Sequence, residues 1–287
     1  MQEVSVIIPC YNDGEFLDDA VHSALQQTYR NIEIVIVDDG STDQFTLSLL
    51  AKSKWERTRI IRQENRGVSA ARNAGISAAK GEFILPLDAD DLIDPTYVEK
   101  ALTVFARKPK AGIVYCRAQR FGLENREWDL PKFNLGAMLL GNIIFCTAFY
   151  RKSDWERVGG YCEDLVAYGD YDLWLKLISL GVDVHQIDEL LFQYRIKESS
   201  MTTTFLTDEK TQISEHARIF QNNKDLYARH AEFLFRRRFD FVFYHQIDDL
   251  ERKAPVTKLK KVLRSYPRLE KLVRALLGKQ KKSIRFL

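Results

Sequence analysis

An apolar segment runs directly into a cluster of carboxylates at Glu82-Phe83-Ile84-Leu85-Pro86-Leu87-Asp88-Ala89-Asp90-Asp91. Its first six residues have the length and composition of a buried β-strand. The next four positions hold three acids. An apolar run that ends abruptly in charged residues is typical of a covered strand of a parallel sheet, whose faces are both buried. The sequence therefore predicts a strand over residues 82–87 with an acidic loop at its carboxyl end.

The segments on either side continue an alternation of strands and helices. A helix rich in small residues is predicted over residues 67–79, and Asp94-Pro95 predicts a helix start with the acid as cap. This alternation predicts an α/β fold, a Rossmann-like and mostly parallel central sheet flanked by helices. Further strands are predicted over residues 4–9, 32–37, 59–62, 112–117 and 190–196, and further helices over residues 16–25, 42–52 (capped by Ser41 or Thr42), 170–180 and 205–249.

Three polar loops follow predicted strands, at residues 10–14, 38–43 and 88–91. Ligands of open parallel sheets bind outside the carboxyl ends of the strands, so we expect these loops to meet at one edge. Asp88 and Asp90 would repel each other without a cation, and their oxygens suit Mg²⁺ or Mn²⁺. The alternative is a turn with helix caps, which we expect for Asp91. Asp38-Asp39-Gly40-Ser41 could hold the N3–H of a uracil, but it is also common turn chemistry.

Four blocks of the sequence resemble the opening motifs of family 2 glycosyltransferases, in that family's order and spacing. The resemblance covers roughly residues 3–200 and implies a GT-A fold and an inverting, single-displacement transfer from a nucleotide-sugar. The blocks are Val4-Ser5-Val6-Ile7-Ile8-Pro9-Cys10-Tyr11-Asn12, Val37-Asp38-Asp39-Gly40-Ser41-Thr42-Asp43, Asn65-Arg66-Gly67-Val68-Ser69-Ala70-Ala71-Arg72-Asn73-Ala74-Gly75 and Leu87-Asp88-Ala89-Asp90-Asp91.

The resemblance also implies roles for single residues. Pro9, Tyr11 and Asp39 would line the nucleoside pocket, with Tyr11 near the base and Asp39 binding it. Arg72 would lie near the diphosphate or support the Asp39 loop. Asp90 would be the principal ligand of Mn²⁺ or Mg²⁺, and Asp88 would contact the metal or the ribose. Without the family context, Tyr11 would be an ordinary loop aromatic and Arg72 a surface ion-pair partner.

The second half of the chain resembles the part of the family that supplies the general base. The matching segment is Ala167-Tyr168-Gly169-Asp170-Tyr171-Asp172-Leu173-Trp174-Leu175, and Asp170 takes the base position. Gly169 stands where the family commonly has Glu, which leaves that neighbouring role in doubt. Asp170 would also suit a helix N-cap, and Asp172 is the reserve candidate.

A last matching segment contains Arg195 and Lys197. Many relatives have His where this chain has Lys197, and a protonated lysine pairs with phosphate but does not ligate a metal. We expect Arg195 or Lys197 to close over the diphosphate. The family's QxxRW motif and membrane spans are both missing from the sequence, which argues against a cellulose-synthase-like polymerase.

The composition, with 45% hydrophobic and 29% charged residues in 287 positions, is that of an ordinary folded protein. The formal net charge of +3 hides a basic tail, since residues 252–287 hold 13 Lys and Arg and one acid. Membrane lipid or nucleic acid would fit that charge, and a solvated helical face is the alternative. Because Leu and Val recur among the cations, we expect amphipathic helices that lie on an anionic membrane or pack on a second subunit, with no nucleic acid bound.

Cysteine usage and the N-terminus bear on localisation. No CxxC or Cys/His spacing occurs, so a disulfide scaffold or structural zinc is not expected and a reducing compartment fits. The chain enters a strand near residue 4, which argues against a targeting signal, and the longest apolar stretch, residues 137–150, is too short and polar to span a bilayer. The sequence thus predicts a cytoplasmic protein peripheral to the inner face of the cell membrane.

These patterns favour one function over two others. The first is transfer of a hexose or N-acetylhexosamine from a UDP-sugar to a hydroxyl of a glycan, lipid-linked or protein-linked acceptor. The second is a non-catalytic nucleotide-sugar-binding or scaffold subunit, which Gly169 and Lys197 leave open. A nucleotidyltransferase lacks support because no Gly-rich basic phosphate loop is seen near the N-terminus. The predicted domains are residues 1–204 (GT-A), 205–250 (helical extension) and 251–287 (basic amphipathic helices).

Overall fold

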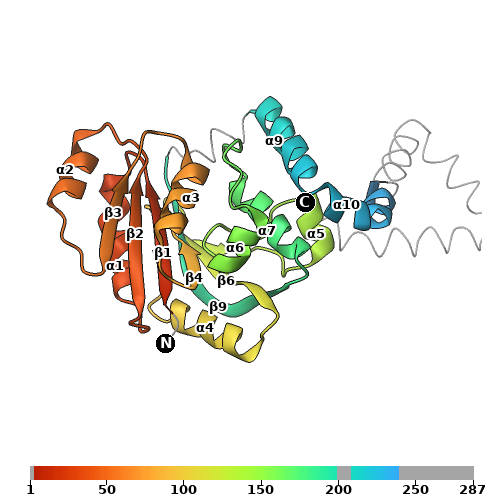
Figure 1. Cartoon of the computed structure of the whole chain (residues 1–287), viewed down its shortest axis with the longest axis horizontal. Coiled ribbons are helices and arrows are strands. Elements are labelled where there is room, and N and C mark those ends of the chain that lie inside the picture. The colour runs from red at the N-terminus through yellow and green to blue at the C-terminus, as the bar shows by residue number, and fades with distance from the viewer. Residues whose placement is uncertain (1–2, 199–207, 239–287) are drawn as a thin grey trace, which may run out of the picture. The chain divides into compact units, whose positions relative to one another are not determined.

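The computed structural model describes residues 3–198 and 208–238 of the chain (Figure 1). The chain divides into two compact units, Met1–Arg229 and His230–Leu287, and residues 230–238 are the described part of the second. The boundary expected at residue 204 and the basic tail over residues 251–287 lie outside the described residues.

The described strands form one sheet that contains parallel and antiparallel pairs. Their bounds are β1 Val4–Cys10, β2 Ile32–Asp38, β3 Thr58–Arg62, β4 Phe83–Pro86, β5 Leu92–Ile93, β6 Ala111–Gly122, β7 Arg126–Trp128, β8 Phe149–Arg151 and β9 Asp183–Ile196. The order is β3-β2-β1-β4-β8-β6-β9-β5, with β7 paired to β6. Strands β1 to β4 are parallel to one another, and β8 is antiparallel to both of its neighbours.

Helices cover both faces of this sheet. Their bounds are α1 Gly14–Leu25, α2 Gln44–Lys52, α3 Val68–Ala78, α4 Tyr97–Arg107, α5 Leu135–Leu140, α6 Lys152–Val158, α7 Gly169–Ser179, α9 Glu209–Asn222 and α10 Lys224–Arg229. Phe149 and Tyr150 are consecutive in β8 and so point to opposite faces. Phe149 meets Tyr97 of α4, with ring centroids 5.0 Å apart, and Tyr150 meets Trp174 of α7 at 5.7 Å. Because both faces are covered, all seven residues of β1 are buried, which explains its continuous apolar run.

The predicted mostly parallel α/β arrangement is confirmed, and the small residues of α3 have the predicted packing role. A Cβ atom on Gly75 would lie 2.6 Å from Ile7 Cγ2, so α3 approaches the sheet as closely as a glycine allows. Two of the predicted helix caps are wrong. Asp43, not Ser41 or Thr42, caps α2, because its Oδ1 accepts the N–H of Thr46 at 2.8 Å. Helix α4 begins at Tyr97, after a turn in which Asp94 Oδ1 accepts the Thr96 N–H at 2.9 Å.

Strand β9 brings the second half of the sequence back to the acidic loop. It runs parallel to β6 and then pairs antiparallel with β5, so Gln193 lies opposite Leu92 and Phe192 opposite Ile93. Since β5 follows the acidic loop directly, the end of β9 lies beside Asp90 and Asp91. This pairing is the structural reason why residues more than 100 positions apart share one site.

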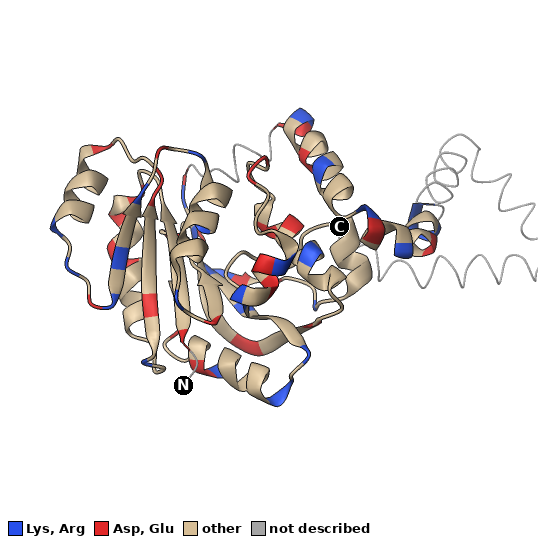
Figure 2. Cartoon of the chain, viewed as in Figure 1, with Lys and Arg blue, Asp and Glu red and all other residues tan. Residues whose placement is uncertain are grey.

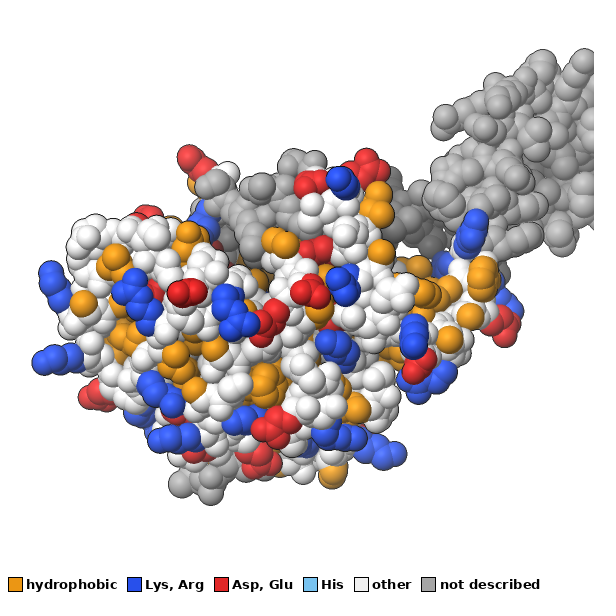
Figure 3. Space-filling view, turned by 45° about the horizontal axis from the view of Figure 1, so that its top comes forward, with side chains coloured by type: hydrophobic (Ala, Val, Ile, Leu, Met, Phe, Trp, Pro, Cys, Tyr) orange, Lys and Arg blue, Asp and Glu red, His pale blue; other side chains and the backbone are white. Residues whose placement is uncertain are grey.

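Charged residues of both signs are interspersed along the described elements (Figure 2). In the space-filling view, hydrophobic side chains appear in small groups between charged ones (Figure 3). The exposed large hydrophobic residues include Phe45, Leu140, Ile213 and Phe220. Over residues 3–198 and 208–238, no helix has the length and apolar character needed to cross a membrane.

Candidate active site

The loops after β1 and β2 are joined side by side. Asn12 has a left-handed backbone, with a φ of 56°, and its Oδ1 accepts the N–H groups of Thr42 and Asp43 at 2.8 and 3.1 Å. The N–H of Asn12 donates in return to Ser41 Oγ at 3.1 Å. Asn commonly adopts this left-handed conformation and bonds locally to backbone. The loops at residues 10–14 and 38–43 therefore meet at one edge of the sheet, as predicted.

Asp39 organises the segment that leads into α3. Its Oδ1 accepts hydrogen bonds from Gln63 Nε2 at 2.7 Å and from the N–H of Arg66 at 3.0 Å, and its Oδ2 accepts the N–H of Gly67 at 2.8 Å. The residue is only 3% exposed. A carboxylate oxygen accepts two hydrogen bonds, so Oδ2 keeps capacity for one more donor. On the neighbouring strand β1, Pro9 is buried, and Tyr11, just after that strand, is 46% exposed.

Arg72 and Asp88 form an ion pair between α3 and the loop after β4. Arg72 Nη2 lies 2.6 Å from Asp88 Oδ1, and the Arg72 side chain is 6% exposed against 30% for Asp88. Burial alone would lower the pKa of Arg72, but Asp88 together with Cys146, Tyr161 and Asp170 outweighs it and raises that pKa well above its usual value. The thiol of Cys146 donates to Asp88 Oδ2 at 3.2 Å. Arg72 is thus an internal residue, and its contact with Asp88 places it beside the acidic loop.

Asp90 is bridged by Lys197 to the first loop. Lys197 Nζ lies 2.7 Å from Asp90 Oδ2 and 2.9 Å from Asp13 Oδ1. Burial raises the pKa of the Asp90 carboxyl and Lys197 opposes that rise, while Asp88 and Asp13 add to it through charge repulsion. The lysine thus acts as an internal counterion among several carboxylates.

Arg195 pins the end of β9 to the same loop. Its N–H donates to Asp91 Oδ1 at 2.8 Å, and its Nε donates to the carbonyl oxygen of Asp90 at 2.7 Å. Its guanidinium stacks on two rings, with centroid distances of 4.5 Å to Phe16 and 4.4 Å to Phe121. Asp91 is fully buried, which fits the structural role expected for it, and burial raises its pKa well above the usual value.

Asp170 lies near Arg72 and Asp88, at the start of α7. Its Oδ2 accepts a hydrogen bond from Asn142 Nδ2 at 3.0 Å, and its Oδ1 accepts the N–H of Tyr171 at 2.8 Å. Burial raises the pKa of Asp170 to about 6, against the lowering effect of Arg72 and the hydrogen bonds. A carboxylate with a pKa just below neutrality is suited to general-base chemistry. The N-cap of α7 is Tyr168, so the suggestion that Asp170 is the cap is wrong.

The neighbours of Asp170 have structural reasons for their identity. A Cβ atom on Gly169 would lie 2.3 Å from Ser69 Oγ, so the glutamate common in the family would require the Ser69 hydroxyl to move. Asp172, the reserve base, is fully buried. Its Oδ2 pairs with Lys176 Nζ at 2.7 Å. Its Oδ1 accepts hydrogen bonds from the side chains of Asn222 and Asn223, at the end of α9. These contacts occupy Asp172 in packing and leave Asp170 as the better candidate.

The carboxylate oxygens of the acidic loop are ligands of a type that suits a divalent metal. Asp88 and Asp90 offer hard carboxylate oxygens and are 30% and 18% exposed, so solvent reaches both. Mg²⁺ typically takes one or two protein carboxylates and completes its shell with water and substrate phosphates. Among the residues that the structure describes, no group of three or more His, Cys, Asp or Glu side chains is arranged to hold a metal. The rest of any shell would therefore come from the donor and water.

Sequence reasoning missed three residues of this constellation. Asp13 bridges to Asp90 through Lys197, Asn142 binds Asp170, and Cys146 binds Asp88. Asp13 lies in a loop already predicted to converge, which was a usable signal. Asn142 and Cys146 lie in the irregular segment after α5, where no periodic pattern reveals the direction of a side chain.

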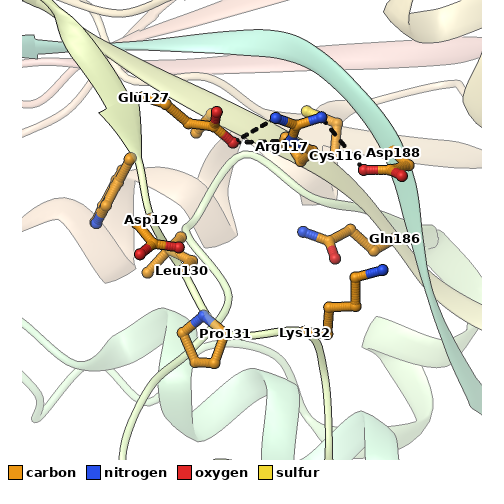
Figure 4. Close-up of a pocket in the computed structure, with 11 residues that line it drawn as sticks. Cys116, Arg117, Glu127, Asp129, Leu130, Pro131, Lys132, Gln186 and Asp188 are labelled. Atoms are coloured by element: carbon orange, nitrogen blue, oxygen red, sulfur yellow. Dashed lines mark hydrogen bonds and ion pairs between the residues drawn. The ribbon is translucent and has the colours of Figure 1, made fainter. Parts of the chain in front are cut away.

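A separate cavity of about 340 Å³ lies between β6, β7, β9 and the chain after β7 (Figure 4). Arg117 crosses it, paired with Glu127 at 2.7 Å and with Asp188 at 3.4 Å. Trp128 and Lys132 also line it. None of the predicted site residues lines this cavity, and the candidate active site therefore stays at the joined loops and the start of α7.

Comparison with known proteins agrees with this geometry. The family model "Glycosyl transferase family 2" matches residues 5–162. An uncharacterised glycosyltransferase of Rickettsia typhi is 32% identical over 215 residues, which are 71% of this chain and 67% of that protein. The chondroitin synthase of Escherichia coli is 31% identical over 188 residues, which cover 63% of this chain and 27% of the synthase. The chain thus spans about a quarter of that synthase.

Solved structures show the same fold. The S. aureus TarS fragment 1–349 in complex with UDP-GlcNAc superposes with a TM-score of 0.62 at 20% sequence identity, over 80% of this chain and 73% of that one. The predicted GT-A fold is therefore confirmed, with its mostly parallel sheet and flanking helices. Because the family model covers more than half of the sequence and includes all three joined loops, the chain belongs to glycosyltransferase family 2 and is a glycosyltransferase enzyme.

Proposed function

We propose that the chain is an inverting transferase that moves a hexose or N-acetylhexosamine from a UDP-sugar to an acceptor hydroxyl in a single displacement. The observation that carries this proposal is Asp170, a carboxylate with a pKa of about 6 beside the ion pair of Arg72 and Asp88. Single-step inversion needs a base that removes the acceptor proton on the face opposite the leaving group. Asp170 is ionised at neutral pH and has that capacity.

In this mechanism the oxygen of the acceptor hydroxyl attacks the anomeric carbon, and Asp170 accepts the proton of that hydroxyl. The bond from that carbon to the β-phosphate oxygen breaks, and its electron pair leaves with UDP. Asn142 donates to Asp170 Oδ2 at 3.0 Å, which orients the carboxylate. Arg72 is the nearest permanent cation and keeps Asp170 from an even higher pKa. The proton, the new glycosidic bond and the departing diphosphate together balance the reaction.

The nucleotide would bind across the joined loops. Asp39 Oδ2 has capacity for the N3–H of uracil, Tyr11 is exposed enough to contact the base, and Pro9 supports the loop from β1. Asp90 and Asp88 would hold Mn²⁺ or Mg²⁺, which when bound would neutralise the charge that develops on the departing diphosphate. Lys197 would leave Asp90 and pair with the phosphates as a point charge. Arg195 would keep its hydrogen bond to the carbonyl oxygen of Asp90 and so hold the acidic loop in place.

UDP is proposed because TarS was crystallised with UDP and with UDP-GlcNAc. Relatives named as chondroitin and hyaluronan synthases support a growing polysaccharide or other surface glycan as acceptor, on a lipid or protein carrier. We further propose a cytoplasmic enzyme held at the inner face of the cell membrane, or at a second subunit, by the basic segment 252–287.

The test uses the purified full chain and a panel of UDP-sugars with Mn²⁺. We expect at least one donor to raise the melting temperature, since a ligand that binds only the folded state stabilises it. Asp170→Asn should keep this shift and lose about 10²- to 10⁴-fold in UDP release, the range typical of general-base removal. Full turnover by Asp170→Asn would contradict the mechanism. Donor binding by the wild type without turnover on any acceptor would instead favour a scaffold subunit.

A further inference from the structure

A buried carboxylate outside the joined loops holds the segment that leads to Asp170. Glu215, in the middle of α9, is only 4% exposed. Its two oxygens accept hydrogen bonds from three consecutive backbone N–H groups, those of Val166, Ala167 and Tyr168. The bond from Tyr168 measures 3.0 Å. Consecutive N–H groups that converge on one anion form a nest, the arrangement by which backbone binds phosphates and carboxylates.

Burying this carboxylate costs free energy that ordinary packing would avoid. A buried charge persists where hydrogen bonds compensate its lost hydration, and hydrogen bonds to an ionised acceptor are the strong ones. Among the described residues, the hydrogen bonds to Glu215 come from the backbone of a loop 47 to 49 residues away in sequence. These bonds fix the path of residues 166–168, where Val166 is 57% exposed and adds little packing and the ring of Tyr168 packs against His216 of α9 at 4.9 Å.

The C-terminal end of α9 also contacts α7 just after Asp170, at Asp172. Glu215, Ile219 and Asn223 are spaced by four residues, so they share one helix face, and all three are buried. The Nδ2 groups of Asn222 and Asn223 donate to Asp172 Oδ1 at 3.0 and 2.9 Å. The contacts of α9 thus end two residues before and two residues after Asp170.

We propose that Glu215 is a positioning residue for Asp170, acting through the backbone that leads into α7. The proposal rests on the proposed function of Asp170 as the base. Glu215 fixes the backbone of residues 166–168, and that backbone fixes the first turn of α7. Without the nest, the carboxylate of Asp170 would sample positions away from the acceptor hydroxyl.

The test is Glu215→Gln in the full chain, with Glu209→Gln as the matched control on an exposed position of the same helix. The amide keeps the size of the side chain but removes the charge and points an N–H₂ group at N–H donors. We expect kcat to fall about 10- to 100-fold, as misplacement of a reacting group by about 1 Å does, with the KM for the donor unchanged within about twofold. Glu209→Gln should match the wild type.

A pH profile separates positioning from general loss of structure. Asp170 faces Arg72, Asp88, Cys146, Tyr161 and Tyr168, and burial dominates its raised pKa. In Glu215→Gln the acidic limb of kcat should move to lower pH, because a loosened Asp170 is less buried. Equal losses in kcat and donor binding with an unmoved limb would mean a purely structural role and would overturn the proposal.

The two proposals fail in different ways. If Asp170→Asn keeps full activity, the proposed base is wrong. If Asp170→Asn is inactive while folded Glu215→Gln has the kcat and pH profile of the wild type, only the positioning role is refuted. Should Glu215→Gln not fold, Glu215→Asp retains the charge but is one methylene too short to reach all three N–H groups. It should then show a smaller loss of kcat with unchanged donor KM, and wild-type kcat would overturn the inference.

Discussion

The pH dependence of turnover should report the protonation of Asp170. With a pKa of about 6, about 90% of this carboxyl is ionised at pH 7 and about 10% at pH 5. Because the base must be ionised to accept a proton, kcat should fall about tenfold for each pH unit below 6 and level off above pH 7. The dominant cause of the raised pKa is burial, with Asp88 adding to it and Arg72 opposing it.

The same pKa predicts a stability effect of known sign. An acid whose pKa is raised on folding destabilises the folded state in its ionised form, so the penalty is absent below about pH 4 and complete above about pH 7. A rise from 3.8 to about 6 corresponds to about 2–3 kcal/mol. The free energy of unfolding of Asp170→Asn should therefore exceed that of the wild type by about 2 kcal/mol at pH 8 and equal it at pH 4. The variant should nevertheless be inactive.

The assay is UDP release across pH 4.5–8.5, together with urea unfolding at both ends of that range. Asp188→Asn is the control, because Asp188 is 76% exposed and is not one of the candidate site residues. A wild-type profile that is flat between pH 5 and 8 would refute the assignment of the base. Unchanged stability of Asp170→Asn at pH 8 would refute the claim that burial sets its pKa.

Three further outcomes follow from contacts in the site. Lys197→Met should bind Mn²⁺ about 5- to 30-fold more tightly in calorimetry without donor, because Asp90 loses its internal counterion; weaker binding would contradict this. Gly169→Ala should cost about 1–3 kcal/mol in thermal or urea unfolding, since its Cβ meets Ser69 Oγ at 2.3 Å, and a second change, Ser69→Gly, should restore most of the loss. Arg72→Met should lower the free energy of unfolding by about 2 kcal/mol, and equal stability would show that its ion pair is dispensable. Because Arg72 lowers the pKa of Asp170, the acidic limb of kcat should also move to higher pH in this variant.

Sequence reasoning succeeded where one physical rule determines the outcome. The mostly apolar runs of β1 and β2 indicated burial on both faces, and parallel strands place their carboxyl ends together, so the joined loops were predictable. The choice of helix cap was less certain, because Ser41, Thr42 and Asp43 are all good caps and the structure selects Asp43.

The remaining features depend on contacts across long sequence separations. Lys197 reaches Asp90 because β9 pairs with β5, and no local pattern encodes that pairing. Glu215 lies on an amphipathic helix where an acid would ordinarily face water, so its burial becomes visible only with the backbone donors in place. The sequence carried the resemblance for Asp170, but the reason for Gly169 required the distance to Ser69.

Because Asp39 holds the segment before α3 through backbone N–H groups, the path of that segment does not depend on the side chains it carries. Asp39 binds the main chain of Arg66 and Gly67, whereas the Arg66 side chain is 62% exposed and pairs with Glu163 at 2.6 Å. Evolution or an engineer can therefore exchange the residue at position 66 without loosening the loop that Asp39 holds.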